Sequence, residues 1–498
     1  MTHSPRRPAA ALLAALLAGA PLRAQPTAPP AAPPAADTAL APFAGTYAYH
    51  GATTLELVPL AGRDGPRLVA VIDEAKYPLR PLGGDRFLNG VGDTIPFARD
   101  AAGRVTGFAE RGTPFRRLAD TVTRAAAASV VPRPPGPDGR PARYAYRPPP
   151  DLGDGLAAGD LAAAGLDRAL AEQLVGRVLD GTYADVDAVL VYRRGRLVLE
   201  EYFHGYDAAR PHQLRSATKS VVAALVGAAV DRGALAGEGE RVLPRLPYGP
   251  LAAYAHPDPR KAALTLGDLL TMRSGLACDD WDAASPGNEN RVYPSPDWVK
   301  FVLDLPQLRD PGAEARYCSG GVHVAGRVVE RATGMPLPDF AQRALFAPLG
   351  VRPADYRWPY ALDSTNARTF AQLSLRPRDL LKFGVLHLDG GRWQGRQVLP
   401  RAWVERSTAR VTRINTRGYG YLWWHQTFAA RTPGGPRRVD VLNASGHGGQ
   451  KLYVLPAHDA VVVFTGSGYA RAGDSAPNAA MADVVLPALL AAGPAGGR

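Results

Sequence analysis

Short runs of alternating apolar and polar residues dominate residues 40–118. Examples are TLELVPL (54–60), RLVAVID (67–73) and GRVTGFAERGTPFRRL (103–118). Gly, Asp or Pro interrupts the alternation about every 8–12 positions, which is typical of short antiparallel strands joined by turns. The pattern therefore predicts a small antiparallel barrel or sandwich over this segment.

Apolar residues at helical spacing become common after about residue 160. The stretch LDRALAEQLVGRVLDG (166–181) predicts a helix. The next stretch, VDAVLVYRRGRLVLEEYF (186–203), predicts two strands around an Arg-Gly turn. Much of the region 250–410 is predicted to be helical with long loops.

Strand patterns return near the C-terminus. GYGYLWWH (418–425) and LYVLPAHDAVVVFTG (452–466) are predicted as strand segments, and a final helix is predicted over about 477–491. Because strands stand at both ends of this region with helices between them, we expect one mixed sheet assembled from both ends.

Segments rich in proline and alanine separate these parts. Residues 1–24 have the form of a secretory signal, because two arginines precede an apolar run too short to cross a bilayer. An uncleaved anchor is the alternative. Linkers are predicted at 25–39 and 119–160. We therefore expect a secreted or periplasmic protein with a β domain at 40–118, a larger domain at 161–495, and no stable membrane insertion after signal cleavage.

The composition fits a two-domain globular protein. The chain has 498 residues, of which 46% are hydrophobic and 21% charged, and its formal net charge is +12. The arginines are scattered, and no RNA-binding or zinc-finger pattern is present, which argues against nucleic acid as a partner. No oligomeric state is predicted.

The chain contains two cysteines, Cys278 and Cys318. In an oxidising compartment they can pair, and a bridge over about 40 residues stabilises a fold by roughly 3–4 kcal/mol in the chain-entropy description. Two buried free thiols are the alternative. Export favours the disulfide.

Lys219 changes the functional picture most. The chain has 58 basic residues but only six lysines, at positions 76, 219, 261, 300, 382 and 451. Arginine can replace lysine on a solvated surface, but it stays charged, whereas a buried lysine can lose its proton and act as a base. Lys219 follows Ser216 by three positions at the start of a predicted helix, so both side chains lie on one face.

A helix N-terminus with a capping serine and a solvated lysine is the simpler explanation of this pair. The run VVAALVGAAV (221–230) argues against it, because a helix that is apolar nearly all round is buried. Lys219 is then enclosed, which favours a catalytic role.

Two further motifs follow in order. YCS (317–319) comes after PGAEAR (311–316), and HGGQ (447–450) precedes a predicted strand. Together with SATK (216–219), they make the chain resemble the serine β-lactamase and penicillin-binding protein superfamily over about residues 165–495. The likeness is greatest to its class C branch of esterases, D-aminopeptidases and 6-aminohexanoate-dimer hydrolases.

This resemblance implies the fold class. The larger domain is expected to be an α/β (α+β) domain of the β-lactamase/transpeptidase type, in which an antiparallel sheet is flanked by helices and joined to a helical subdomain. The preceding all-β domain is similar to the lipocalin-like accessory domains of some secreted serine hydrolases.

The resemblance also implies catalytic roles. Ser216 is expected to be the nucleophile that forms an acyl-enzyme, with Lys219 as the base that accepts its proton. Tyr317 is expected to relay protons to the leaving group and to help activate the deacylating water. The main-chain N–H groups of Ser216 and Gln450 are expected to form the oxyanion hole.

Ser319, His447, Gly448 and Gly449 are implied to bind substrate, the two glycines by allowing substrate close to an edge strand. Penicillin-recognising members usually have asparagine at the position of Ser319 and lysine at that of His447. Losing the amide and the fixed cation argues for an esterase or amidase over an efficient β-lactamase. His447 can also be a structural histidine at a strand start.

Three other groups carry weaker signals. The loop 279–281 is expected mainly to shape the surroundings of Cys278, with a direct contact to substrate as the alternative. The aromatic residues within 419–424 are expected either to line an acyl pocket or to belong to the core. Histidines 204, 212 and 323 lack metal-ligand spacing, and neither a metal nor a cofactor is predicted.

The leading hypothesis is an exported serine hydrolase that cleaves a small-molecule ester, amide or peptide. One alternative is a non-catalytic protein that captures peptide or cell-wall ligands on a hydrolase-like fold. Intact Ser216, Lys219 and Tyr317 argue against it. The other alternative is a penicillin-binding DD-peptidase or β-lactamase, which Ser319 and His447 argue against.

Overall fold

The computed structural model describes residues 39–49, 53–62, 65–135, 143–359, 372–469 and 475–493. The predicted signal, 1–24, lies outside these residues, as does all but the end of the first predicted linker. The chain splits into two compact units. Of the described residues, the N-terminal unit contains those up to Asp73, Pro78–Ala127 and the start of Pro134–Pro141, and the C-terminal unit contains Glu74–Tyr77, Ala128–Arg133 and those after Ala142.

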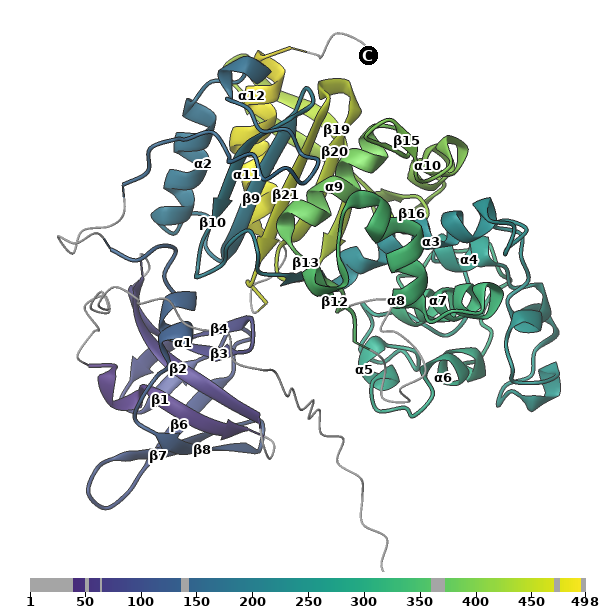
Figure 1. The fold of residues 1–498 in the computed structure, drawn as a ribbon. Coiled ribbons are helices and arrows are strands. Elements are labelled where there is room, and N and C mark those ends of the chain that lie inside the picture. The colour runs from purple at the N-terminus through teal and green to yellow at the C-terminus, as the bar shows by residue number, and fades with distance from the viewer. Residues whose placement is uncertain are drawn as a thin grey trace, which may run out of the picture. The chain divides into compact units, whose positions relative to one another are not determined.

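The N-terminal unit confirms the predicted small β domain. Eight antiparallel strands close into a barrel in sequence order, drawn from purple to blue in Figure 1, and all of them except residues 75–77 of β4 lie in this unit. They are β1 (Gly45–Tyr49), β2 (Thr53–Gly62), β3 (Gly65–Ile72), β4 (Ala75–Gly83), β5 (Arg86–Leu88), β6 (Thr94–Arg99), β7 (Val105–Glu110) and β8 (Thr113–Ala119).

Aromatic side chains fill the interior of this barrel. The ring centroids of Phe43, Phe87 and Phe97 lie 4.9–5.1 Å from one another. Phe108 continues the cluster, at 4.9 Å from Phe97 and 4.4 Å from Phe115. An eight-stranded barrel is just wide enough for its own side chains. The interior is therefore a packed core, and the likeness of this unit to lipocalin-like domains stays a prediction.

The C-terminal unit is built on an eight-stranded antiparallel sheet of strand order β10-β9-β21-β20-β19-β18-β17-β16. Strands from both ends of the region meet where β9 pairs with β21, the second and third strands of this order, as the sequence predicts. The strands of this unit are β9 (Val186–Arg193), β10 (Arg196–Tyr202), β11 (His212–Gln213), β12 (Tyr356–Arg357), β13 (Ser374–Leu375), β14 (Arg392–Trp393), β15 (Arg396–Gln397), β16 (Thr412–Ile414), β17 (Arg417–Tyr419), β18 (Trp424–Thr432), β19 (Gly435–Gly446), β20 (Gln450–Leu455) and β21 (Ala460–Gly466).

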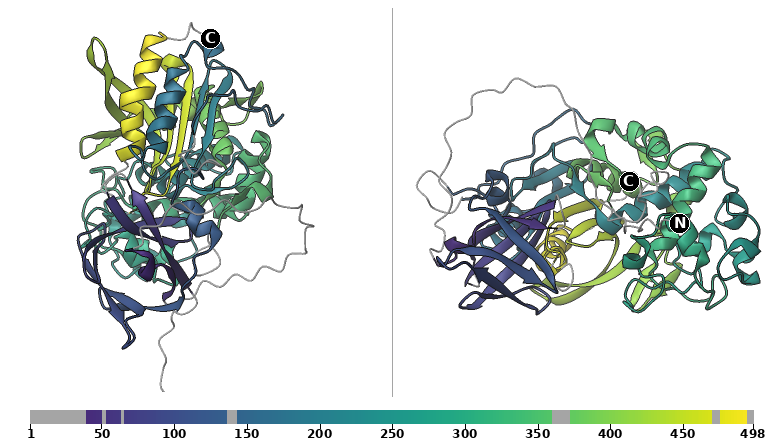
Figure 2. Two further views of the ribbon diagram at one scale, coloured as in Figure 1. Left: turned by 90° about the vertical axis from the view of Figure 1, so that its left-hand side faces the viewer. Right: turned by 90° about the horizontal axis from the view of Figure 1, so that it is seen from below.

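Helices cover both faces of this sheet and form a separate helical region beside it, as Figures 1 and 2 show. The helices of this unit are α2 (Ala169–Leu179), α3 (Thr218–Asp231), α4 (Leu266–Leu270), α5 (Glu289–Val292), α6 (Trp298–Asp304), α7 (Ser319–Thr333), α8 (Leu337–Ala341), α9 (Pro377–Leu388), α10 (Arg401–Thr408), α11 (Ser475–Ala480) and α12 (Leu486–Ala491). Helix α1 (Arg124–Ser129) begins in the N-terminal unit and ends in the C-terminal unit. None of the helices formed by the described residues is long and apolar enough to cross a membrane.

The alternation of side chains along β9 explains the layers. Ala188 and Leu190 point into one core, which α3, α7 and α9 complete. Val189 and Val191 point into the other core, which α2, α11 and α12 complete. Because both faces are buried, residues 188–191 in the middle of the strand form an apolar run with no polar alternation. The observed fold is the predicted antiparallel sheet flanked by helices, with a helical subdomain.

Two segments differ from the simple prediction. The segment 418–425, predicted as one strand, is interrupted between β17 and β18, where Leu422 has a φ of 60°. Ser220 Oγ donates a hydrogen bond to the Leu422 carbonyl oxygen at 2.7 Å, which holds this bend against α3. The predicted linker 119–160 contains α1, and Tyr146 within it donates from its hydroxyl to Val198 O.

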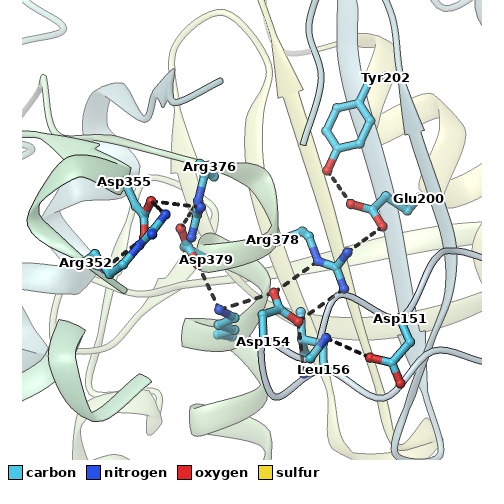
Figure 3. A network of polar contacts seen from close by, with 12 residues as sticks. Asp151, Asp154, Leu156, Glu200, Tyr202, Arg352, Asp355, Arg376, Arg378 and Asp379 are labelled. Atoms are coloured by element: carbon cyan, nitrogen blue, oxygen red, sulfur yellow. Dashed lines mark hydrogen bonds and ion pairs between the residues drawn. The ribbon is translucent and has the colours of Figure 1, made fainter. Parts of the chain in front are cut away.

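Figure 3 shows a network of ion pairs at the start of α9. Arg378 is 2% exposed and lies 3.2 Å from both Glu200 and Asp154. Arg376 Nε donates to Asp379 in the first turn of the helix at 2.6 Å. Strand β13 directly precedes α9 and pairs with β11. The network therefore anchors the short sheet that leads into the Ser216 turn.

Candidate active site

Ser216 lies in a tight turn between β11 and α3. Arg215, directly before it, has a φ of 50°, a left-handed conformation that costs a non-glycine residue about 1 kcal/mol or more. The turn continues as a 3-10 helix, Arg215–Ala217, and then as α3, whose residues from Thr218 to Ala229 are buried. Burial of the predicted apolar run thus fixes the turn, and Ser216 itself stays half-buried.

Lys219 is enclosed beside Ser216, as a catalytic role requires. Lys219 is 1% exposed, and its Nζ lies 2.7 Å from Ser216 Oγ. The same Nζ stands 4.9 Å from the ring centroid of Tyr317. The structure therefore brings together the three residues to which the sequence assigns the chemistry.

A disulfide next to Tyr317 ties two loops together. Cys278 and Cys318 are bonded, and among the described residues there is no free cysteine. Cys318 also caps α7, since its Sγ accepts a hydrogen bond from Gly321 N at 3.4 Å. Tyr317 therefore directly precedes the residue that both forms the cross-link and caps the helix. The bridge closes 40 residues, which corresponds to about 4 kcal/mol of stabilisation in the chain-entropy description.

Three aromatic rings stack beside Lys219. The Tyr317 ring lies 5.3 Å from that of Trp281 and 5.6 Å from that of Trp424, and both pairs are close to parallel. Trp281 is 52% exposed, whereas Trp424 is 7% exposed and packs edge-on against Tyr419 at 4.5 Å. The stack thus extends from the core to solvent and forms an apolar wall next to Tyr317.

Asp280, in the loop that follows Cys278, forms hydrogen bonds with the main chain on both sides of Cys318. Its Oδ2 accepts from Ser319 N at 2.7 Å, its Oδ1 accepts from Glu289 N at 2.9 Å, and its own N–H donates to Tyr317 O at 2.8 Å. Burial raises the pKa of the Asp280 carboxyl to about 6, against the opposing effects of hydrogen bonding to Ser319 and of the Lys219 charge. The sequence identifies this loop but not its contact with α7.

We expect the Asp280→Asn variant to change how stability depends on pH. The folded-state pKa of about 6 lies above the ordinary value of 3.8, so the folded protein binds more protons than the unfolded chain between these values. Stability from this group therefore falls as pH rises from about 4 to about 6, by up to about 3 kcal/mol. Urea unfolding at pH 4.5 and 7 should show that the free energy of unfolding of Asp280→Asn, relative to that of the parent, is higher at pH 7 than at pH 4.5. Parallel pH profiles would contradict this.

The HGGQ motif forms the turn between β19 and β20. Gly448 and Gly449 have φ values of 88° and 103°, which favour glycine, and a Cβ at Gly448 would lie 2.4 Å from the Tyr469 ring. The exposed His447 contacts Tyr469 O through Nε2 at 3.0 Å. The glycines are therefore required by the packing of the turn itself.

Gln450 is fully buried and holds this turn to the end of β21. Its side-chain Nε2 donates to Gly466 O, and its Oε1 accepts from Gly466 N at 3.2 Å. Nε2 also lies 3.3 Å from His447 O. The main chain around Gln450 is thus fixed at the start of β20. Its predicted place in an oxyanion hole stays a prediction, as do the substrate contacts assigned to Ser319, which is fully buried, and to His447.

Among the described residues, no group of three or more His, Cys, Asp or Glu side chains is arranged to hold a metal ion. Sequence reasoning missed a different set of polar contacts. His204 and His212, which lack ligand spacing in the sequence, both contact the buried carboxylate of Asp187. These residues are too far apart in the sequence for a motif to connect them.

The family of the chain follows from comparison with known proteins. The family model described as Beta-lactamase matches residues 166–486. The protein therefore belongs to the β-lactamase family, and it is an enzyme of the serine hydrolase type. The matched region contains all three motifs that the sequence analysis singles out.

Individual relatives match over part of their length. The 6-aminohexanoate-dimer hydrolase of Paenarthrobacter ureafaciens is 28% identical over 302 residues, which cover 56% of this chain and 71% of that protein. The esterase EstB of Burkholderia gladioli is 31% identical over 209 residues, covering 38% of this chain and 50% of EstB. The solved structure of EstCE1, a hydrolase with promiscuous acyltransferase activity, has a TM-score of 0.51 at 18% identity and covers 64% of this chain and 98% of EstCE1, which shows a shared fold.

Proposed function

We propose that the protein is an exported serine hydrolase that cleaves ester or amide bonds through an acyl-enzyme on Ser216. The contact of 2.7 Å between Lys219 Nζ and Ser216 Oγ in a buried site carries this proposal. A serine hydroxyl is a weak nucleophile until a neighbouring base takes its proton, and Lys219 in its neutral form can do so.

In acylation, Ser216 Oγ bonds to the substrate carbonyl carbon and its proton passes to Lys219. The carbonyl oxygen becomes an oxyanion, which the N–H groups of Ser216 and Gln450 stabilise. Collapse restores the carbonyl and breaks the bond to the leaving group, which takes up a proton through Tyr317. Water then attacks the acyl carbon, so that a carboxylic acid and free Ser216 are released.

The surroundings of Ser216 favour a substrate with an apolar group. Trp281 and Trp424 form the apolar wall beside Tyr317, and the exposed half of Trp281 is available to a ligand. His447 stands where penicillin-recognising members usually have a lysine, so the motif lacks a permanent cation for a carboxylate. The names of the relatives, a dimer hydrolase and an esterase, agree with small amides and esters as substrates.

Export is supported by the Cys278–Cys318 disulfide and by the signal-like sequence of residues 1–24. Structural disulfides persist in oxidising compartments and are rare in the cytosol. We therefore place the reaction outside the cytoplasm.

The purified protein tests this function directly. We expect it to hydrolyse a short-chain p-nitrophenyl ester and to react with a fluorophosphonate probe, with the added mass on the peptide that contains Ser216. Benzylpenicillin in a parallel assay is expected to turn over more slowly than the ester. Neither hydrolysis nor labelling would favour the non-catalytic binding protein, and faster turnover of the penicillin would favour a β-lactamase.

A further inference from the structure

Polar side chains are buried around Asp187 of β9, away from the residues that react. The Asp187 side chain is 0% exposed. Its Oδ1 accepts from Lys76 Nζ and His204 Nδ1, each at 2.9 Å, and from Ser467 Oγ at 3.1 Å. Its Oδ2 lies 2.9 Å from His212 Nε2. Four side chains from three separate stretches of the sequence, at position 76, at 204–212 and at 467, therefore meet β9 at one carboxylate.

Lys76 supplies the counter-charge in this cluster. Burial raises the pKa of the Asp187 carboxyl, but the Lys76 charge and hydrogen bonds from His204 and His212 outweigh burial and hold that pKa well below its usual value. Burial lowers the pKa of His204, the Lys76 charge lowers it further, and the hydrogen bond and charge of Asp187 oppose this only in part. A buried carboxylate requires such a paired cation.

The contact of Asp187 Oδ2 with His212 connects the carboxylate to the segment that contains Ser216. His212, held by Oδ2, begins the short strand β11, and Ser216 follows four residues later. Gln213 N donates to Glu74 Oε2 at 3.2 Å, so the Glu74–Tyr77 segment contacts this strand directly as well as through Asp187. The position of β11 sets the direction in which the chain enters the turn at Arg215 and Ser216.

The contact of Asp187 Oδ1 with Ser467 connects the carboxylate to the segment that packs against the HGGQ turn. Ser467, held by Oδ1, directly follows β21. The next residue, Gly468, donates from its N–H to Gly448 O at 3.1 Å. A Cβ at Gly466 would lie 2.7 Å from Gly448 O, so the two segments pack at backbone contact.

Gln450 is the last residue in this series of contacts from Asp187 through Ser467. Both polar atoms of its side chain bond the main chain of Gly466, one residue before Ser467. A shift of Ser467 is therefore transmitted to Gln450, whose N–H is proposed to bind the oxyanion. In the same way, a shift of His212 is transmitted to Ser216.

We propose that Asp187, paired with Lys76, is a positioning residue that fixes the main chains of Ser216 and Gln450 relative to each other. The inference rests on the proposed function, since it concerns the two N–H groups of the proposed oxyanion hole. Such donors act only when they meet the oxyanion oxygen at hydrogen-bond distance, and a misplacement of 1 Å can reduce the rate about 10²-fold.

The position of Lys76 in the sequence gives the proposal a specific consequence. Glu74–Tyr77 belongs to the C-terminal unit, although the chain on both sides of it, to Asp73 and from Pro78, belongs to the N-terminal unit. Lys76, a residue outside the expected domain at 161–495, thus takes part in positioning the site at Ser216. No sequence motif of the hydrolase region contains it.

Lys76→Met in the full-length protein is the test. We expect kcat for a p-nitrophenyl ester to fall about 10²-fold while KM changes less than about 2-fold, because the oxyanion hole acts on the transition state. Lys76→Met leaves the buried Asp187 carboxylate without its counter-charge. The double variant Lys76→Met/Asp187→Asn removes that charge as well. We expect this double variant to recover the thermal midpoint of the parent but not its kcat, and it carries the test if Lys76→Met does not fold.

Lys261→Met is the matched control. Lys261 is also buried, at 1% exposure, but its Nζ donates to Leu303 O, outside the Asp187 cluster. We expect this variant to lose stability and keep its kcat. An active parent with unchanged kcat in both Lys76 variants would overturn the inference alone, as would equal loss of kcat in Lys261→Met. A parent that neither hydrolyses the ester nor takes the probe would overturn the proposed function and the inference with it.

Discussion

Ser216→Ala is expected to lower ester hydrolysis by about 10⁴–10⁶-fold and to abolish the covalent adduct with a fluorophosphonate. Alanine removes the only atom that the proposed reaction bonds to the acyl group. Steady-state assays measure the rate, and intact-protein mass spectrometry measures the adduct. Because Ser216 is half-buried in a turn held by the main chain and by the buried α3, we expect the variant to keep its fold.

Ser220→Ala is the matched control for this experiment. Ser220 lies on α3, one turn beyond Ser216, and its hydroxyl donates to Leu422 O at 2.7 Å. Its removal is expected to cost about 1 kcal/mol of stability through the lost hydrogen bond while the adduct still forms. An adduct that survives in Ser216→Ala and disappears in Ser220→Ala would show that Ser220, and not Ser216, is the nucleophile, and would refute the proposal.

Lys219→Arg is expected to lower kcat/KM by about 10³–10⁴-fold. The guanidinium stays protonated at this enclosed position and so cannot accept the Ser216 proton. Steady-state kinetics with the p-nitrophenyl ester measure the change, and circular dichroism checks that the larger side chain leaves the fold intact.

Lys219→Ala makes the test of the base sharper. It leaves a space next to Ser216 Oγ, which lies 2.7 Å from Nζ in the parent. We expect a small primary amine in the assay to restore part of the activity, and more so at higher pH, where more of the amine is neutral. Activity within tenfold of the parent in Lys219→Arg would show that Lys219 is not the base.

Much of the fold could be predicted because the signals are local. The two strands around an Arg-Gly turn are confirmed as β9 and β10, which flank Arg194 and Gly195. The long apolar run after Lys219 is confirmed as the buried helix α3. The interruption at Leu422 could not be predicted, because distant residues help to hold it: Ser220 donates to the Leu422 carbonyl oxygen, and Leu422 N donates to Leu270 O.

The same difference applies to the site. Ser216 and Lys219 lie on adjacent turns, so their spacing alone shows that the side chains can meet. The cluster around Asp187 involves partners from position 76 to position 467, and none of them is unusual in its local sequence. Only the fold brings them together. The roles of Ser216, Lys219 and Tyr317 in catalysis stay predictions until the variants are measured.

The pairing of β9 with β21 has a consequence for how the protein is made. Val186 pairs with Gly466, and the Asp187–Ser467 hydrogen bond joins residues 280 positions apart. Such distant contacts form late, because the whole intervening loop must close first. A ribosome-bound chain therefore has Ser216 and Lys219 long before it has the strand that carries Gln450. A nascent chain is consequently expected to be inactive until synthesis is nearly finished, and the same is expected of a product truncated before β20.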